Sequence, residues 1–212
     1  MIIGLVGFIG AGKGTVGQFL IDKGFYSDSF AAALKDCVSI IYNWDRDMLE
    51  GITKESREWR TKPDEYWSRV YGYPFTPRMA LQTFGTDACR NNLHENIWCE
   101  SLGTRIRGLE NVVITDVRFK NEIDYVRQLG GKVVRISRGE HPHWFDYLSQ
   151  VFDENERRSF MKQFGIHQSE WDWVGEDLDY VIENSGSLEC LQARVNELIE
   201  KIKTGDNYET IK

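Results

Sequence analysis

The sequence opens on a pattern that predicts a strand, a glycine loop and a helix in direct succession. Residues 1–6 form an apolar run rich in β-branched side chains, and residues 7–15 read Gly-Phe-Ile-Gly-Ala-Gly-Lys-Gly-Thr before an amphipathic stretch at 16–20. Such a loop directs backbone N–H groups, a helix N-terminus and one lysine at a common centre, which suits a polyphosphate. Its glycines let the backbone bend and approach phosphate closely. This start constrains the chain to an α/β fold with a buried parallel strand ending at a phosphate loop.

The loop residues have individual expected roles. The residues expected to bind phosphate are Gly10, Ala11, Gly12, Lys13 and Gly14, with Lys13 reaching the β- and γ-phosphates. Thr15 is the candidate Mg²⁺ ligand. In the general pattern a Ser or Thr directly follows the lysine, whereas Gly14 intervenes here, so Thr15 would act on Mg²⁺ directly or through water. The alternative is a glycine turn without a ligand, which the preceding apolar strand and the following helix disfavour.

Composition narrows the class of partner. The 212 residues fit one domain with a small inserted lid, and the formal charge of −7 argues against a nucleic-acid-binding or anionic-membrane-binding surface. A polyanion would have to be held by a local pocket of arginine and lysine, which fits a nucleotide. Neither a signal peptide nor a membrane span is expected, so we expect a cytoplasmic protein. The four cysteines are widely spread and are expected to be free thiols.

Hydrophobic periodicity predicts the remaining elements. They are a short strand or turn at 25–30, helices at 31–42, 76–90, 95–107, 121–129 and 188–202, strands at 111–115, 132–136 and 179–182, and a polar tail at 205–212. Together with the first strand and helix, they predict a P-loop α/β fold, a parallel sheet with helices on both faces.

Two stretches interrupt this alternation. Residues 45–76 interleave cations and aromatic rings, and they predict a substrate-covering insertion. The rings could sandwich a base, or they could form a helical hairpin that packs on the core. Residues 140–173 are polar, aromatic and punctuated, and they predict a short helical lid.

Three side chains on the predicted helix at 76–90 could hold an anionic acceptor. Arg78, Gln82 and, nearly, Arg90 recur at three-to-four-residue multiples, so they can present two guanidinium groups and an amide on one face. Lys35, at the start of the helix at 31–42, is a further candidate. A solvated surface role is the alternative for each of these cations.

The carboxyl ends of the predicted parallel strands supply the remaining candidates, because ligands bind at that edge of an open α/β sheet. Asp116 follows the strand at 111–115 and could hold Mg²⁺ or its water, or else cap the next helix. Arg118 could neutralise acceptor charge, or pair with Glu122 four residues on. Arg138 follows the strand at 132–136 and could close over a transferred phosphoryl group.

Several of these stretches together resemble one family. They are Gly7 to Thr15, Pro77-Arg78-x-x-Leu81-Gln82-x-x-Gly85-Thr86-Asp87, Thr115-Asp116-x-Arg118, His167-x-Ser169-Glu170 and Asn184-Ser185-Gly186-Ser187-Leu188. This set resembles the deoxynucleoside monophosphate kinases of tailed bacteriophages. The loop form Gly-x-Gly-Lys-Gly-Thr is similar to that of adenylate kinase and its relatives, and the turn at Asn184 looks like that of dephospho-coenzyme A kinase.

The resemblance implies transfer of the ATP γ-phosphate to the 5′-phosphate of a deoxynucleoside monophosphate, with Mg²⁺. It implies that Lys13 and the loop hold ATP, that Thr15 and Asp116 serve Mg²⁺, and that Asn184 lies near the adenine. It further implies that Arg78, Gln82, Arg90 and Arg118 face the acceptor and that Arg138 clamps the phosphoryl group.

The preferred base and the oligomeric state, monomer or homodimer, stay open. If the protein is phage-encoded, its compartment is the cytoplasm of the infected cell. The rival functions are another small-molecule P-loop kinase, similar to dephospho-coenzyme A kinase, and a switch module that binds ATP without an acceptor.

Overall fold

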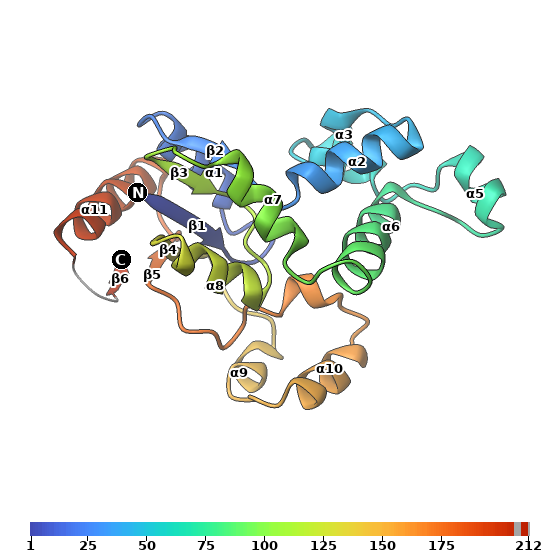
Figure 1. The fold of residues 1–212 in the computed structure, drawn as a ribbon. Coiled ribbons are helices and arrows are strands. Elements are labelled where there is room, and N and C mark those ends of the chain that lie inside the picture. The colour runs from blue at the N-terminus through green and yellow to red at the C-terminus, as the bar shows by residue number, and fades with distance from the viewer. Residues whose placement is uncertain (206–208, 212) are drawn as a thin grey trace. The chain divides into compact units, whose positions relative to one another are not determined.

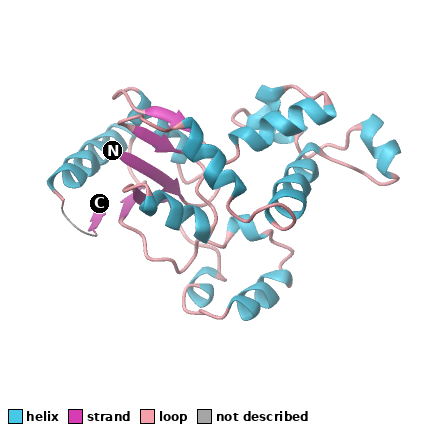
Figure 2. Ribbon diagram, viewed as in Figure 1, coloured by secondary structure: helices cyan, strands magenta, loops and turns pink. Residues whose placement is uncertain are grey.

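The fold is described from a computed structural model that covers residues 1–205 and 209–211. The chain divides into two compact units. The first combines Met1–Ser29 with Gly108–Lys212 and is called the sheet unit. The second, Phe30–Arg107, is called the helical unit, because it contains helices and no strand (Figure 2).

The sheet unit is built on six parallel strands in the order β2-β3-β1-β4-β5-β6 (Figure 1). The strands are β1 Ile2–Val6, β2 Tyr26–Asp28, β3 Val112–Ile114, β4 Lys132–Ser137, β5 Tyr180–Glu183 and β6 Glu209–Ile211. Strand β1 lies at the centre, where Gly4 pairs with Ile114 on one side and with Val133 on the other. The predicted parallel sheet is confirmed.

Helices cover both faces of this sheet, as predicted. Side chains alternate between the faces of a strand, so Ile3 and Leu5 of β1 join a fully buried cluster with residues of α1 (Lys13–Ile21) and α11 (Leu188–Thr204). Gly4 points the opposite way, where a Cβ would lie 3.1 Å from Val126 of α8 (Lys120–Gln128). The apolar, β-branched strands are therefore buried between two helical layers.

The last described residues differ from the prediction. Residues 205–212 are polar overall and were expected to form a tail, but residues 209–211 pair in parallel with β5 as strand β6. The reason is Ile211, whose side chain is 1% exposed and belongs to the same buried cluster as Ile3 and Leu5. One apolar residue in a polar sequence is thus enough to place a short edge strand.

The lid-like segment, residues 140–173, belongs to the sheet unit. It contains α9 (Phe145–Leu148), α10 (Glu154–Lys162) and the 3₁₀ turn η2 (Gln168–Glu170). Arg157 of α10 is 5% exposed, and its guanidinium donates to the carbonyls of Leu148 at 3.0 Å, Val151 at 3.1 Å and Val174 at 2.7 Å. One buried arginine therefore ties together chain segments on both sides of α10.

The helical unit begins with α2 and ends with α7. Its elements are α2 Ala32–Tyr42, α3 Arg46–Glu50, α4 Lys54–Trp59, α5 Glu65–Tyr71, α6 Pro77–Gln82, the π-helix η1 Thr83–Arg90 and α7 Ile97–Arg105. The hydroxyl of Thr76 accepts from the backbone N–H of Met79 at 3.1 Å, and Pro77 occupies the first turn, so the predicted start of this helix is confirmed.

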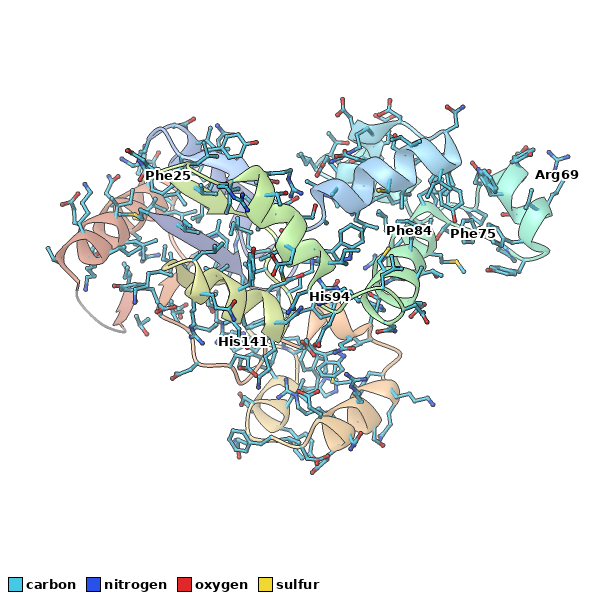
Figure 3. The ribbon with its side chains drawn as sticks, in the orientation of Figure 1. Phe25, Arg69, Phe75, Phe84, His94 and His141 are labelled. Atoms are coloured by element: carbon cyan, nitrogen blue, oxygen red, sulfur yellow. The ribbon has the colours of Figure 1, made fainter. Side chains whose placement is uncertain are left out.

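The aromatic rings of residues 45–76 pack on one another. Tyr42 and Trp44 stack with ring centroids 4.5 Å apart, and the indole N–H of Trp67 donates to the carbonyl of Tyr42 at 3.1 Å. Phe75, labelled in Figure 3, is 3% exposed, whereas Arg69 on α5 extends away from the unit. Of the two alternatives for this stretch, core packing holds for Trp59, Trp67 and Phe75.

Candidate active site

The glycine loop between β1 and α1 has the backbone that its sequence predicts. Gly7 has a φ of 145°, and a Cβ there would lie 2.4 Å from the carbonyl oxygen of Ile136 on β4. Gly12 has a φ of 105°, and a Cβ there would lie 2.3 Å from the side-chain nitrogen of Asn184. These conformations and approaches admit only glycine. The loop is thereby pressed between the ends of β4 and β5 and opens directly into α1.

Lys13 lies over the loop. Its Nζ donates to the carbonyls of Gly7 at 2.6 Å and Phe8 at 3.0 Å. Burial, with a smaller contribution from the charge of Arg118, lowers the pKa of Lys13 to about 8, although Glu170 and Asp116 act in the opposite direction. A nearby polyphosphate would reverse this shift, because an opposite charge stabilises the ammonium form.

The segment after β3 places Asp116 and Arg118 beside this lysine, since both charges act on the pKa of Lys13. The N-cap residue of α8 is Phe119, three residues after Asp116. The carboxylate of Glu122, 2% exposed, accepts from the backbone N–H of Arg118 at 2.8 Å and of Phe119 at 3.1 Å, and Asp172 accepts from that of Lys120 at 3.0 Å. Asp116 therefore does not occupy the N-cap position of α8.

The ion-pair alternative for Arg118 is also wrong. Glu122 bonds to the backbone of Arg118, and the side chain pairs instead with Glu170 of η2, at 2.8 Å between Nη1 and Oε1. Sequence reasoning singled out the motif containing Glu170 without giving this carboxylate a partner. Because 52 residues separate the two, spacing alone could not reveal the pair.

Phe8 joins the glycine loop to the lid-like segment. Its ring lies with its centroid 5.0 Å from that of Trp173, 5.7 Å from that of Trp144 and 5.8 Å from that of Phe145, all in edge-on geometry. The guanidinium of Arg135 lies 4.7 Å from the centre of the Phe145 ring. We call Phe8, Trp144, Phe145 and Trp173 the Phe8 cluster. Its ring geometry favours aromatic attraction as well as burial.

His141 and Arg135 both contact the Phe145 ring of the Phe8 cluster. Because a guanidinium can only donate, Arg135 donates to Nε2 of His141 at 2.7 Å. Burial, and next the charge of Arg135, lowers the pKa of His141, which favours the neutral ring that can accept this bond. Figure 3 labels His141 beside the ribbon of the sheet unit. Arg135 therefore has structural partners within the sheet unit.

Two further predicted residues lie at the same sheet edge. The side-chain nitrogen of Asn184 donates to the carbonyl of Ala11 at 2.8 Å, and its backbone N–H donates to Ser137 at 2.6 Å. Asn184 is 8% exposed, and its bond to Ala11 holds the loop in place. Arg138 follows β4 directly and is exposed. The sheet unit thus brings together Lys13, Asp116, Arg118 and Asn184 around the loop, with Arg138 at the edge.

The helix that carries Arg78, Gln82 and Arg90 changes type along its length. The spacing argument assumed a single α-helix, and this assumption is wrong: α6 ends at Gln82, and η1 continues to Arg90 as a π-helix. Two π turns hold about nine residues, since each is about one residue longer than an α turn. Arg90, eight residues after Gln82, therefore still lies near the face that carries Gln82.

Gly85 explains how α2 packs against this π-helix. A Cβ at Gly85 would lie 2.7 Å from a terminal methyl of Leu34 on α2, so only glycine leaves room for this leucine. The indole N–H of Trp98 donates to the carbonyl of Gly85 at 2.9 Å. A π-helix is an uncommon element that is often found at functional sites, and the sequence pattern did not reveal it.

Lys35 on α2 already has a partner within the helical unit. Its Nζ lies 2.5 Å from the carboxylate of Glu50, which also pairs with Arg46. Burial acts to raise the pKa of Glu50, but Lys35 and then Arg46 outweigh it, so the pKa of this carboxyl is lowered. The predicted substrate contact of Lys35 would therefore compete with an ion pair whose lysine side chain is 12% exposed.

The comparisons with known proteins identify the family. A family model described as deoxynucleotide monophosphate kinase matches residues 64–147, which include Arg78, Gln82 and Arg118. A protein of Acanthamoeba polyphaga mimivirus named "Putative deoxynucleotide monophosphate kinase" is 37% identical over 152 residues, covering 65% of this chain and 74% of that protein. The chain belongs to the deoxynucleotide monophosphate kinase family. Membership makes the glycine loop the nucleotide-binding part of a kinase.

The viral relative gives no support to one detail of the prediction. It comes from mimivirus, so an origin in a tailed bacteriophage stays a prediction.

Among the described residues, none of the helices has the length and apolar character that crossing a membrane requires.

Two solved structures are similar over nearly the whole chain. TT1252 from Thermus thermophilus aligns with a TM-score of 0.46 and 17% identity over 95% of this chain and 97% of its own. Dephospho-CoA kinase from Campylobacter jejuni aligns with a TM-score of 0.45 and 16% identity over 97% and 98%. These values bear on neither the reaction nor the site residues of this member of the family.

Proposed function

We propose that this family member transfers the γ-phosphate of ATP to the 5′-phosphate of a deoxynucleoside monophosphate. An oxygen of the acceptor phosphate attacks the γ-phosphorus, the bond to the β–γ bridging oxygen breaks, and ADP and a deoxynucleoside diphosphate leave. The observation that supports this most is the grouping of Lys13, Arg118 and Asp116 at one glycine loop. Phosphoryl transfer needs alignment and charge neutralisation more than a covalent catalyst, and this group supplies both.

The oxygen donors near the loop fit Mg²⁺. Mg²⁺ is usually held by one or two protein oxygen ligands together with phosphates and water. Thr15 offers a hydroxyl at the start of α1, and Asp116 offers a carboxylate after β3. The two segments meet, because a Cβ at Gly17 would lie 3.1 Å from the Thr115 methyl group. When bound, Mg²⁺ neutralises phosphate charge; Thr15 and Asp116 would hold it, and Lys13 would orient the β- and γ-phosphates.

In this proposal the acceptor is held by the side chains on α6 and η1. Arg78 and Arg90 supply charge for the 5′-phosphate, and Gln82 supplies an amide. Family membership supports this, because the matched region contains all three residues. Arg118 neutralises charge on the acceptor, and Arg138 neutralises charge on the group in transfer.

The test is a substrate panel with product identification. The purified chain is incubated with ATP and Mg²⁺ and, separately, with each deoxynucleoside monophosphate, each ribonucleoside monophosphate and dephospho-coenzyme A. We expect deoxynucleoside diphosphates. We expect Lys13→Ala to abolish them and Lys23→Ala, which changes an exposed lysine just beyond the same helix, to leave the rate unchanged. Phosphorylation of dephospho-coenzyme A alone, or ATP loss without any acceptor, would refute the proposal.

A second pair of variants tests the acceptor site. Arg78→Ala is expected to raise the KM for the acceptor about 10-fold or more, as befits loss of a charge-assisted hydrogen bond, while the KM for ATP stays the same. Arg69→Ala, which removes an exposed arginine of the same unit, is the matched control. Equal behaviour of the two variants would remove Arg78 from the acceptor site.

A further inference from the structure

Arg118 is held at two points that come from different parts of the sheet unit. Its backbone N–H donates to Glu122 at 2.8 Å, which fixes the chain at the start of α8. Its guanidinium donates to Oε1 of Glu170 at 2.8 Å, which fixes the far end of a long side chain. A guanidinium has five N–H donors, and this bond engages Nη1. A free arginine side chain loses rotamer entropy on binding, and the second point of attachment reduces that loss.

The turn that carries Glu170 is itself fixed to the segment that carries Arg118. Nδ1 of His167 accepts from the backbone N–H of Ser169 at 3.2 Å. The carboxylate of Asp172, 8% exposed, accepts from the side chain of Gln168 at 2.7 Å and from the backbone N–H of Lys120 at 3.0 Å. Glu170 is therefore held on both sides of its turn and offers Arg118 a stationary partner.

The electrostatics of the loop make a carboxylate here unfavourable for phosphate binding. Both Glu170 and Arg118 are close enough to act on the pKa of Lys13, so Glu170 repels any anion held by that lysine. Stability does not account for Glu170 either, because ion pairs as exposed as this one contribute little to the stability of a fold. The side chains of Arg118 and Glu170 are 42% and 21% exposed. The bond from the Arg118 guanidinium gives this carboxylate a direct effect on Arg118.

We propose that Glu170 is a positioning residue that holds the Arg118 guanidinium in the orientation needed for phosphoryl transfer. The inference rests on the proposed function, in which Arg118 neutralises acceptor charge. Glu170 acts through Arg118 and touches no substrate itself. The Arg118–Glu170 pair also makes the turn at the end of the lid-like segment part of the site.

The test is a double-mutant cycle on kcat and KM. Glu170→Gln keeps the shape of the side chain and removes its charge, and we expect it to lower kcat about 10- to 100-fold, since small misplacements of reacting groups cost this much. The KM for ATP should change less than threefold. In an Arg118→Ala background the same substitution should have no further effect.

Glu176→Gln is the matched control. Glu176 pairs with Lys120 at 3.1 Å and its side chain is 20% exposed, against 21% for Glu170, but it belongs to no part of the proposed site. This control should leave kcat within twofold, and both variants should unfold at the same temperature as the wild type. Glu170→Asp, with the charge retained, should recover part of the lost rate.

Several results would overturn the inference. They are a Glu170→Gln rate within twofold of wild type, a rate loss that multiplies with that of Arg118→Ala, or a loss matched by a drop in melting temperature. If the wild type phosphorylates no acceptor, the proposed function fails first. The pair is then tested by calorimetric titration with ADP and Mg²⁺. A Glu170→Gln affinity that equals or exceeds that of the wild type fits a carboxylate near the phosphates, and a weakened affinity contradicts it.

Discussion

Replacing Phe8 with alanine should weaken the contact between the glycine loop and the lid-like segment. The Phe8 ring is half-buried and meets three aromatic rings of residues 144–173 edge-on at 5.0–5.8 Å. Its backbone carbonyl also accepts from Lys13, and that bond does not depend on the side chain. The substitution therefore removes the ring contacts while it leaves the main-chain bonds of the loop in place.

The expected loss follows from burial and from ring geometry. Truncating a fully buried phenylalanine costs about 3–5 kcal/mol. Truncating a half-buried ring should cost roughly half as much. Each edge-on aromatic contact contributes about 0.5–1.5 kcal/mol in addition to the effect of buried area. Since these terms overlap, we expect Phe8→Ala to lower the free energy of unfolding by about 2–3 kcal/mol. Phe8→Leu, which keeps most of the area without a ring, should cost about 1 kcal/mol.

The assay is urea unfolding followed by far-ultraviolet circular dichroism, with tryptophan fluorescence as a second probe. Ile9→Ala is the control, because this neighbouring apolar residue is 66% exposed and should cost less than 0.5 kcal/mol. Comparing the urea slopes shows whether the two units unfold together. If Phe8→Ala loses no more stability than Ile9→Ala, the ring contacts of the Phe8 cluster do not stabilise the fold, and the reasoning is refuted.

Three further predictions concern stability. A Cβ at Gly10 would meet no atom within 4 Å, so Gly10→Ala should cost only about 1–2 kcal/mol, for its left-handed φ. A Cβ at Gly12 would lie 2.3 Å from the side-chain nitrogen of Asn184, so Gly12→Ala should cost about 3 kcal/mol or more. Urea unfolding measures both losses. Because the pKa of Glu50 is lowered in the folded state, its contribution is present above the ordinary glutamate pKa and is lost as the pH falls through the folded value. Urea unfolding between about pH 3 and 6 should therefore give a flatter profile for Glu50→Gln than for the wild type. Arg157→Met removes the donor from the carbonyls of Leu148, Val151, Trp171, Asp172 and Val174. It should cost about 3 kcal/mol or more by thermal unfolding, whereas Arg158→Met, at an exposed position, should cost almost nothing.

The strands and the loop could be predicted because local sequence dictates them. A β-branched run such as 111–115 has few alternatives to a buried strand, and the glycine pattern before Lys13 specifies a backbone that other residues cannot adopt. The parallel sheet followed from those runs alternating with helical periods. These signals lie within windows of about ten residues, which is the range over which pattern reasoning works.

Features set by distant contacts could not be predicted in the same way. Glu170 and Arg118 are 52 residues apart, and the local sequence around each residue does not indicate its partner. The π-helix at 83–90 contacts Leu34 and Trp98 at Gly85, and the α-helical period of these residues gave no sign of the change in helix type. The packing of Phe8 and Ile211 could not be predicted either, because a single apolar residue produces no hydrophobic periodicity in the sequence.

The position of β1 has a consequence for how the chain reaches its fold. Strand β1 lies at the centre of the sheet, yet its partners β3 and β4 follow it by more than 100 residues, with Ile2 opposite Val112 and Ile3 opposite Lys132. During synthesis, its apolar edges have no native neighbour until the residues of β3 and β4 have left the ribosome. Such non-local pairing slows folding and exposes strand edges to aggregation. Expression of this protein should therefore gain more from slower translation or added chaperones than from a stronger promoter.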